Sequence, residues 1–275
     1  MKLAMKLSRV WLQLALSLAM VMFHFVTSER SLAANSKKTV DPSPQVPERG
    51  KLPSALISLH AENSPFSHYA LLVDKKLRTL MVWDMRGDRV KFISAFGIDI
   101  GAKPGDKQRQ GDQRTPEGIY FIQKSLEGKN IDSEKYGERA FTLDYPNPFD
   151  RLENKTGGGI WLHAVSDKTS LKRGSHGCVV VRNSTIAELT RYIELKRTPV
   201  VVSDSVEYLS EREWAVAQRK LKSQLEGANP IKISSLQAFN LRNKIVARVV
   251  GDDQAARTVY AVQAETGALQ IVSEN

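Results

Sequence analysis

Cysteine is almost absent from this 275-residue sequence, in which Cys178 is the only one. A single cysteine cannot form a disulfide within the chain, so the small disulfide-stapled folds are excluded. No cluster of basic and aromatic residues points to nucleic acid. One cysteine with two nearby histidines, and no carboxylates at ligand spacing, is a poor metal site. We therefore expect neither a metal ion nor nucleic acid as a partner. The hydrophobic content of 41% is that of an ordinary globular protein.

The first 33 residues follow the order of a secretory signal. Lys2, Lys6 and Arg9 precede an apolar run over 10–26, and Ser31-Leu32-Ala33 then offers small residues for a signal peptidase. We predict a signal peptide over 1–33 and a protein exported to the periplasm or the cell wall. The run approaches the ~20 apolar residues of a membrane span, so the segment, if left uncleaved, would anchor the protein to the membrane.

The formal charge is +10. Residues 1–33 hold four positive charges and one negative charge, so the chain from residue 34 onward carries +7. This excess suits a polyanionic partner such as a carboxylate-rich wall polymer, and it is equally compatible with a role in solubility alone.

Proline and polar residues fill the segment 34–66, which predicts a linker with a short helix over 54–60. From 67 to 204, short apolar runs separated by turn residues predict an antiparallel sheet or a closed barrel. The segment 124–159 lacks periodicity and is typical of a lid or binding loop. A helix is predicted from 183, where Thr185 and Glu188 have the spacing of a capping box. The predicted strands are 70–73, 80–83, 90–96, 119–122, 160–163, 179–181 and 200–202.

The remaining segment, 205–275, predicts a small α+β module. Ser210 and Glu213 have the spacing of a capping box before an amphipathic helix that includes Trp214. Four strands separated by turn residues follow, over 236–241, 245–250, 258–262 and 269–272. The predicted fold class is therefore mainly β with α: a β-rich domain over 67–204 and this C-terminal module.

The residues with chemical potential are Cys178 and two histidines. A free thiol supplies little thiolate at pH 7, so a nucleophilic cysteine needs a nearby base. His163 ends a predicted strand and can approach Cys178 from a neighbouring strand. His176 is closer in sequence, but residues two apart on an extended chain point the same way without meeting. Gly177 permits a sharp turn, after which the N–H groups of Gly177 and Cys178 would hold an oxyanion.

Ser175-His176-Gly177-Cys178, with His163 on an apolar strand upstream, resembles the active-site signature of the L,D-transpeptidase family. The segments 104–107, 111–112 and 114–120 resemble the region that precedes this site in the family, so the resemblance covers about 68–203. It implies a β-rich domain in which Cys178 forms an acyl-enzyme and His163 is the base, with the backbone carbonyl of Ala164 orienting the imidazole. The implied substrates are peptidoglycan stem peptides, cut between a diamino acid and D-alanine, and no cofactor is expected.

Two positions depart from the family pattern. Ala164 replaces the usual glycine, which leaves a backbone-carbonyl role intact. Val180 stands where an arginine is common, and Arg182 either binds a substrate carboxylate in its place or is a solvated charge at the end of the strand. Ser175 is a second candidate for substrate binding.

The segments 145–150 and 159–163 resemble the L,D-carboxypeptidase branch, which favours hydrolysis over cross-linking. A catalytically weak wall-binding or scaffold protein with the same fold is the alternative function.

Overall fold

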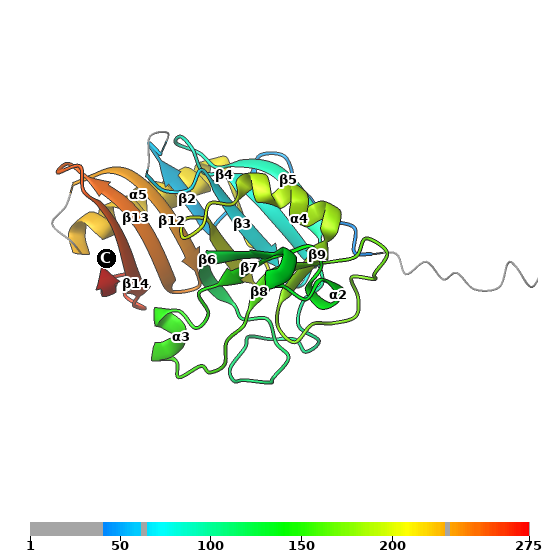
Figure 1. The fold of residues 1–275 in the computed structure, drawn as a ribbon. Coiled ribbons are helices and arrows are strands. Elements are labelled where there is room, and N and C mark those ends of the chain that lie inside the picture. Colours follow the sequence, from blue (N-terminus) through cyan, green and yellow to red (C-terminus); the bar gives the residue numbers. More distant parts are fainter. Residues whose placement is uncertain (1–40, 62–64, 229–231, 275) are drawn as a thin grey trace, which may run out of the picture. The chain divides into compact units, whose positions relative to one another are not determined.

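Strands dominate the computed structural model, which describes residues 41–61, 65–228 and 232–274. The predicted signal peptide 1–33 lies outside the described residues. From residue 40 onward the chain clusters as one unit, which contains an eight-stranded sheet, a five-stranded sheet and a two-stranded ribbon (Figure 1).

The eight-stranded sheet is mixed and nearly closed into a barrel. Its strand order is β5-β4-β3-β10-β6-β7-β8-β9, with parallel pairs at β3–β10 and β8–β9. Isolated bridges from Asp99 to Val180 and from Gly101 to Ser175 join the segment after β5 to the other edge. The strands are β3 (Tyr69–Asp74), β4 (Thr79–Asp84), β5 (Lys91–Gly97), β6 (Gly118–Glu127), β7 (Arg139–Leu143), β8 (Trp161–Val165), β9 (Val179–Arg182) and β10 (Pro199–Ser203).

Several of these strands contain continuous runs of buried apolar residues because both faces of the sheet are covered. Alternate side chains of a strand point to opposite faces. In β6, Tyr120 and Ile122 enter the core inside the barrel, whereas Ile119 and Phe121 enter a second core shared with the C-terminal sheet. The continuous apolar runs of the sequence thus encode two cores.

The five-stranded sheet has the order β15-β14-β13-β12-β2, and the long helix α5 (Glu211–Ala228) packs against it. Its first strand in the chain, β2 (Leu56–Leu59), pairs with β12 across the whole length of the barrel sequence. In the ribbon, β1 (Lys51–Pro53) pairs with β11 (Tyr208–Ser210). The other strands are β12 (Ile233–Leu241), β13 (Lys244–Gly251), β14 (Ala256–Gln263) and β15 (Leu269–Glu274).

The predicted linker needs correction over 51–59, because β1 and β2 lie there and no helix forms over 54–60. Leu56 and Ile57 are buried, and α5 holds this strand through two hydrogen bonds. Trp214 Nε1 donates to Leu56 O at 2.9 Å, and Gln218 Nε2 donates to Ser58 O at 2.5 Å. Tertiary pairing, rather than local propensity, makes this segment a strand.

Short helices complete the barrel: η1 (Gly128–Asn130), α2 (Ser133–Tyr136), α3 (Pro148–Leu152), α4 (Asn183–Leu189) and η2 (Thr190–Tyr192). The capping box predicted at Thr185 and Glu188 is wrong, since α4 begins at Asn183 with no side-chain cap. The one predicted at Ser210 is confirmed, because Ser210 and Glu213 exchange hydrogen bonds at the start of α5. None of the helices described is long and apolar enough to cross a membrane.

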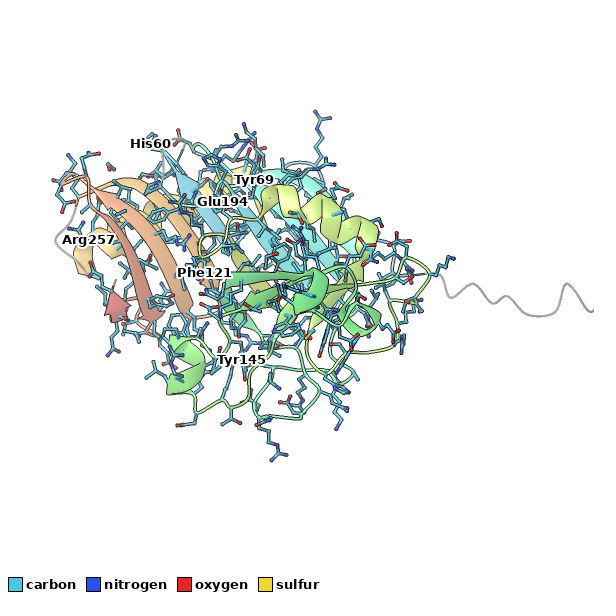
Figure 2. The ribbon with its side chains drawn as sticks, viewed as in Figure 1. His60, Tyr69, Phe121, Tyr145, Glu194 and Arg257 are labelled. Atoms are coloured by element: carbon cyan, nitrogen blue, oxygen red, sulfur yellow. The ribbon has the colours of Figure 1, made fainter. Side chains whose placement is uncertain are left out.

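Aromatic and cationic side chains fill the contact between the two large sheets. Phe121 of β6, labelled in Figure 2, meets Phe239 of β12 edge-on, with ring centroids 6.2 Å apart. The buried guanidinium of Arg248 lies 4.1 Å from the centre of the Phe121 ring and donates to the carbonyls of Lys196 and Arg197. The C-terminal sheet is therefore packed onto the barrel by specific contacts.

Candidate active site

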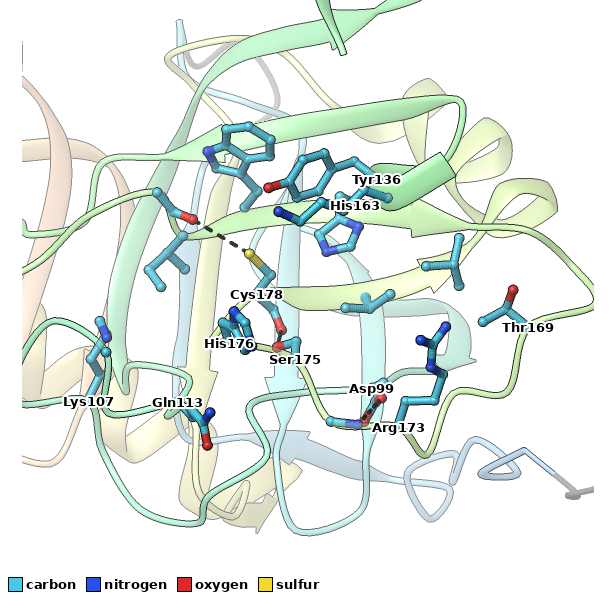
Figure 3. A pocket seen from close by; sticks show the side chains of 18 of the residues that line it. Asp99, Lys107, Gln113, Tyr136, His163, Thr169, Arg173, Ser175, His176 and Cys178 are labelled. Atoms are coloured by element: carbon cyan, nitrogen blue, oxygen red, sulfur yellow. Dashed lines mark hydrogen bonds between the residues drawn. The ribbon is translucent and has the colours of Figure 1, made fainter. Parts of the chain in front are cut away.

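His163 and Cys178 come together because β8 and β9 are parallel neighbours. The register sets His163 beside Val180, and Cys178 lies two residues before Val180 on the same face. The alternate residues, such as Leu162 and Val179, point into the barrel core. The thiol and the imidazole therefore project from adjacent strands into one cavity (Figure 3).

Gly177 allows the chain to turn sharply just before the thiol. Its φ of +128° favours glycine, and a Cβ at this position would lie only 2.7 Å from the carbonyl oxygen of Arg114. The Ser175 hydroxyl fastens the same turn, since it accepts from the Gly177 N–H at 3.0 Å and donates to Cys178 O at 2.6 Å. Ser175 thus shapes the turn that carries the nucleophile.

The tautomer of His163 follows from its backbone contact. Nδ1 lies 2.8 Å from the carbonyl oxygen of Ala164, which can only accept, so Nδ1 carries the proton and Nε2 of the neutral ring is free of one. The ring of Tyr136 meets His163 edge-on at 5.2 Å and restrains its orientation. The imidazole is therefore held in the form that accepts a proton at Nε2.

Burial keeps both groups uncharged at rest. Desolvation raises the pKa of the Cys178 thiol, although the backbone N–H of Trp161 and the charges of Lys107 and Lys135 oppose this shift. Desolvation also lowers the pKa of His163, against the carbonyl contacts of Ala164 and Tyr136. The thiol itself donates to Gly159 O at 3.6 Å. A neutral thiol beside a neutral imidazole is an arrangement in which the proton moves as the sulfur attacks.

The cavity around these groups has a volume of about 690 Å³, which is large enough for a short peptide segment. The loop 107–113 forms one wall, α2 another, and the segment 166–176 a third. Apolar area is supplied by Ile160, Trp161, Val165 and Val180, and polar groups come from the loops.

Asp99 is a site residue that the motif search missed. Its carboxylate is buried, forms an ion pair with Arg78, and accepts a hydrogen bond from the Gly174 N–H at 2.7 Å. Its backbone exchanges hydrogen bonds of 2.8 Å with Val180. Asp99 thus ties the loop before Cys178 to the opposite edge of the barrel.

Comparisons with known proteins agree with this geometry. The family profile of YkuD, the L,D-transpeptidase catalytic domain, matches residues 68–202. The structure of Bd1075 from Bdellovibrio bacteriovorus is similar with 32% identity and a TM-score of 0.68, over 82% of this chain and 97% of that one.

This chain belongs to the L,D-transpeptidase catalytic domain family.

Two further matches are more distant. YafK of Escherichia coli (strain K12), whose assignment as an L,D-transpeptidase is itself provisional, is 29% identical over 120 residues. That region is 43% of this chain and 44% of YafK, so the match spans less than half of YafK's length. Pgp2, the helical cell shape determining protein of Campylobacter jejuni, shares the fold with 19% identity and a TM-score of 0.58, over 81% of this chain and 95% of that one.

Two charged residues of the upstream segments that resemble the family, Asp106 and Glu117, belong to a largely buried ionic cluster. We define the ionic cluster as Lys75, Asp106, Glu117, Asp150 and Lys155. Lys155 Nζ lies 2.7 Å from Asp106 and 3.1 Å from Asp150, and Lys75 Nζ lies 2.9 Å from Glu117. Burial lowers the pKa of Lys155, but its carboxylate partners outweigh this and raise the pKa above its ordinary value.

The ionic cluster fixes the loop that walls the cavity. Lys75 Nζ donates to the carbonyls of Gly105 and Thr115 at 2.7 and 3.0 Å, and Asp106 accepts from the Glu117 N–H at 2.8 Å. Lys107 and Asp112 form a further ion pair within the same loop, at 2.8 Å. These bonds account for the charged residues Asp106, Lys107, Asp112 and Glu117 in this segment.

Arg182 does not line the cavity, so its placement does not support the predicted contact with substrate. Its guanidinium pairs with Asp41 and donates to the carbonyls of Ser166 and Asp167. Asp41 in turn accepts from the Leu171 N–H at 3.0 Å. Arg182 therefore fastens the N-terminal segment to the loop before the nucleophile.

The predicted oxyanion donors differ in their availability. The Gly177 N–H is already bonded to Ser175 Oγ, so it is not free for a substrate oxygen. The Cys178 N–H remains the predicted donor. In the part of the chain that the structure describes, no three His, Cys, Asp or Glu side chains gather in a way that could hold a metal ion.

Proposed function

We propose that this protein is an exported cysteine enzyme that cleaves peptidoglycan stem peptides at the bond between the L-centre of a diamino acid and D-alanine. The observation that carries the proposal is the pairing of Cys178 and His163 on neighbouring strands of one cavity, with Nδ1 of His163 committed to Ala164 O. Membership of the L,D-transpeptidase family supplies the substrate class.

The reaction begins when Nε2 of His163 takes the thiol proton and the sulfur of Cys178 attacks the carbonyl carbon. The carbonyl contacts of Ala164 and Tyr136 favour the protonated imidazole that forms. The C–N bond then breaks, the D-alanine amine leaves with the proton from Nε2, and a thioester remains on Cys178. Water, deprotonated by His163, releases the shortened peptide, whereas attack by an amine of a second peptide would give a cross-link.

We favour hydrolysis, which makes the protein an L,D-carboxypeptidase. Val180 occupies the position where an arginine is common in the family, and it faces the cavity as a buried apolar side chain. Arg182 does not replace that arginine, because it is bound to Asp41.

The test incubates the chain from residue 34 onward with purified disaccharide-tetrapeptide and follows the products by mass spectrometry. We expect loss of one alanine, and a decrease of at least about 1,000-fold for Cys178→Ala, which removes the nucleophile. Cross-linked dimers, or exchange with added D-amino acids, would identify a transpeptidase. If the wild type and Cys178→Ala were equally inactive, the result would support the scaffold alternative. Alkylation of Cys178 in the folded wild type would then measure whether the thiol is reactive.

A further inference from the structure

Two of the charged side chains that line the cavity already have partners. The carboxylate of Asp99 is held by Arg78 and by the Gly174 N–H. The ammonium of Lys107 is buried and bonded to Asp112 at 2.8 Å. These side chains are fixed within the protein, so neither leaves an uncompensated charge for a ligand.

The other two charged residues, Lys135 and Arg173, are exposed and have no carboxylate partner among the described residues. Lys135 Nζ lies over the ring of its neighbour Tyr136, 5.1 Å from the centroid. No ion pair or hydrogen bond joins the Arg173 side chain to another described residue. Lys135 interacts with the Tyr136 side chain and feels the charge of Asp132, but it forms no ion pair. The cavity therefore offers two positive charges with no carboxylate in contact, which favour an anionic ligand.

The two cations lie in different parts of the cavity. Lys135 is on α2, next to the tyrosine that packs against His163, and its charge acts on both Cys178 and His163. Arg173 lies in the loop before the nucleophile, beside Asp99 and away from Tyr136 (Figure 3). A ligand that satisfies both must carry two separate negative groups.

We propose that Lys135 and Arg173 are carboxylate-recognition positions that restrict the substrate to peptides in which the terminal carboxylate and the carboxylate of the diamino acid side chain are both free. This inference rests on the proposed function and deepens it. Lys135, close to the reacting pair, binds the terminal carboxylate of the leaving D-residue, which is one carbon from the leaving nitrogen. Arg173, further away, binds the carboxylate at the far end of the diamino acid side chain. Peptides in which either carboxylate is amidated, or absent as in lysine, are poorer ligands.

Calorimetric binding to the Cys178→Ala protein tests this without turnover. The probes are four synthetic tetrapeptides that differ only at the terminal carboxylate and the carboxylate of the diamino acid side chain. Both are free in the dicarboxylate, one is amidated in the terminal amide or the side-chain amide, and both are amidated in the diamide. We expect each amidation to weaken binding about five- to tenfold, the range of a charge-assisted hydrogen bond at a partly exposed site. Lys135→Gln should remove only the effect of terminal amidation, and Arg173→Gln only that of side-chain amidation.

Lys129→Gln and Lys172→Gln are matched controls, since each removes an exposed positive charge close in sequence to Lys135 or Arg173 without altering the cavity lining. Equal binding of the dicarboxylate and the diamide would overturn the proposal, as would controls that reproduce the two variants. The proposed function is tested separately. A protein that discriminates the amides but never cleaves the dicarboxylate would retain these subsites and lose its proposed activity.

Discussion

Two groups of buried polar side chains border the segment 98–117, and burial has opposite results in them. In the ionic cluster every charge faces an opposite charge, and the pKa of Lys155 is raised by its carboxylates. The catalytic pair forms no ion pair, and desolvation raises the pKa of Cys178 against the charges of Lys107 and Lys135. Desolvation also lowers the pKa of His163, in the same direction as the charge of Lys135. For Lys155 and the catalytic pair, charged partners decide whether the buried group stays ionised, whereas at Asp150 burial outweighs Lys155 and raises the pKa of the carboxyl.

The exposed cations of the cavity complete this comparison. Lys155 has three carboxylate partners, whereas Lys135 and Arg173 have none among the described residues. The ammonium group of Lys155 therefore stabilises the fold, whereas that of Lys135 is available to a ligand.

Removing the central cation of the ionic cluster should have the largest effect. We expect Lys155→Met to lower the free energy of unfolding by about 3–5 kcal/mol, because Asp106 and Asp150 would lose their buried counter-ion. Urea unfolding measures this, and Lys135→Met should leave the value nearly unchanged, because Lys135 is exposed and has no carboxylate in contact. Similar losses in the two variants would show that pairing does not distinguish these lysines.

The pH profile of turnover should report the neutral pair. Because the pKa of His163 is lowered from 6.5, the base is unprotonated at neutral pH, and kcat/KM should fall about tenfold per pH unit only below that pKa. Because burial raises the pKa of Cys178 above its ordinary value, the thiol stays protonated through neutral and mildly alkaline pH, and the profile should be level over that range. His176→Gln should keep this profile, whereas a lost acid limb in that variant would make His176 the base.

The contact between the C-terminal sheet and the ionic cluster should have a smaller effect. Arg242, in the β12–β13 turn, lies 2.5 Å from Glu117, which also keeps its bond to Lys75. We expect Arg242→Ala to lower the free energy of unfolding by about 1 kcal/mol, since Glu117 remains partnered. Arg257→Ala removes the ion pair between β14 (Figure 2) and Asp253 in the β13–β14 turn, and this exposed pair should affect the free energy of unfolding less than Arg242 does.

The smallest effect on substrate binding is expected at Arg182. Because its guanidinium is bound to Asp41, Arg182→Ala should leave KM for the tetrapeptide within about twofold, in contrast to Arg173→Gln. Steady-state kinetics on the two variants make the comparison. A KM increase at Arg182 as large as that at Arg173 would return Arg182 to the substrate site.

Local patterns predicted most of the barrel and the central residues of the candidate site. The runs at 70–73, 119–122 and 179–181 are confirmed as strands, because buried apolar side chains leave a signal within a few residues. The approach of His163 to Cys178 from a neighbouring strand also agrees with the structure, whereas their catalytic roles stay predictions. The mixed sheet could not be read from such runs, since strand direction depends on the connections between them.

Features that depend on distant partners were missed. β2 pairs with residues near 237, and Arg182 pairs with Asp41, so neither environment is visible in the neighbouring sequence. Other misses had a local signal. Asn147 and Asp150 form a capping box with proline at the first turn of α3, and Asp99 stands between two isoleucines, a pattern typical of a buried, partnered carboxylate.

The pairing of β2 with β12 has a consequence for the order in which the protein can mature. The barrel is an insertion between two adjacent strands of the small sheet, so β2 is synthesised first and waits for a partner that follows some 177 residues later. In a chain that crosses a membrane from its N-terminus, the exposed edge and the apolar side chains of β2 stay uncovered until the last segment arrives. The five-stranded sheet can therefore form only late in synthesis. A chain that ended after the barrel would leave β2 unpaired, with an exposed edge that favours association with other chains.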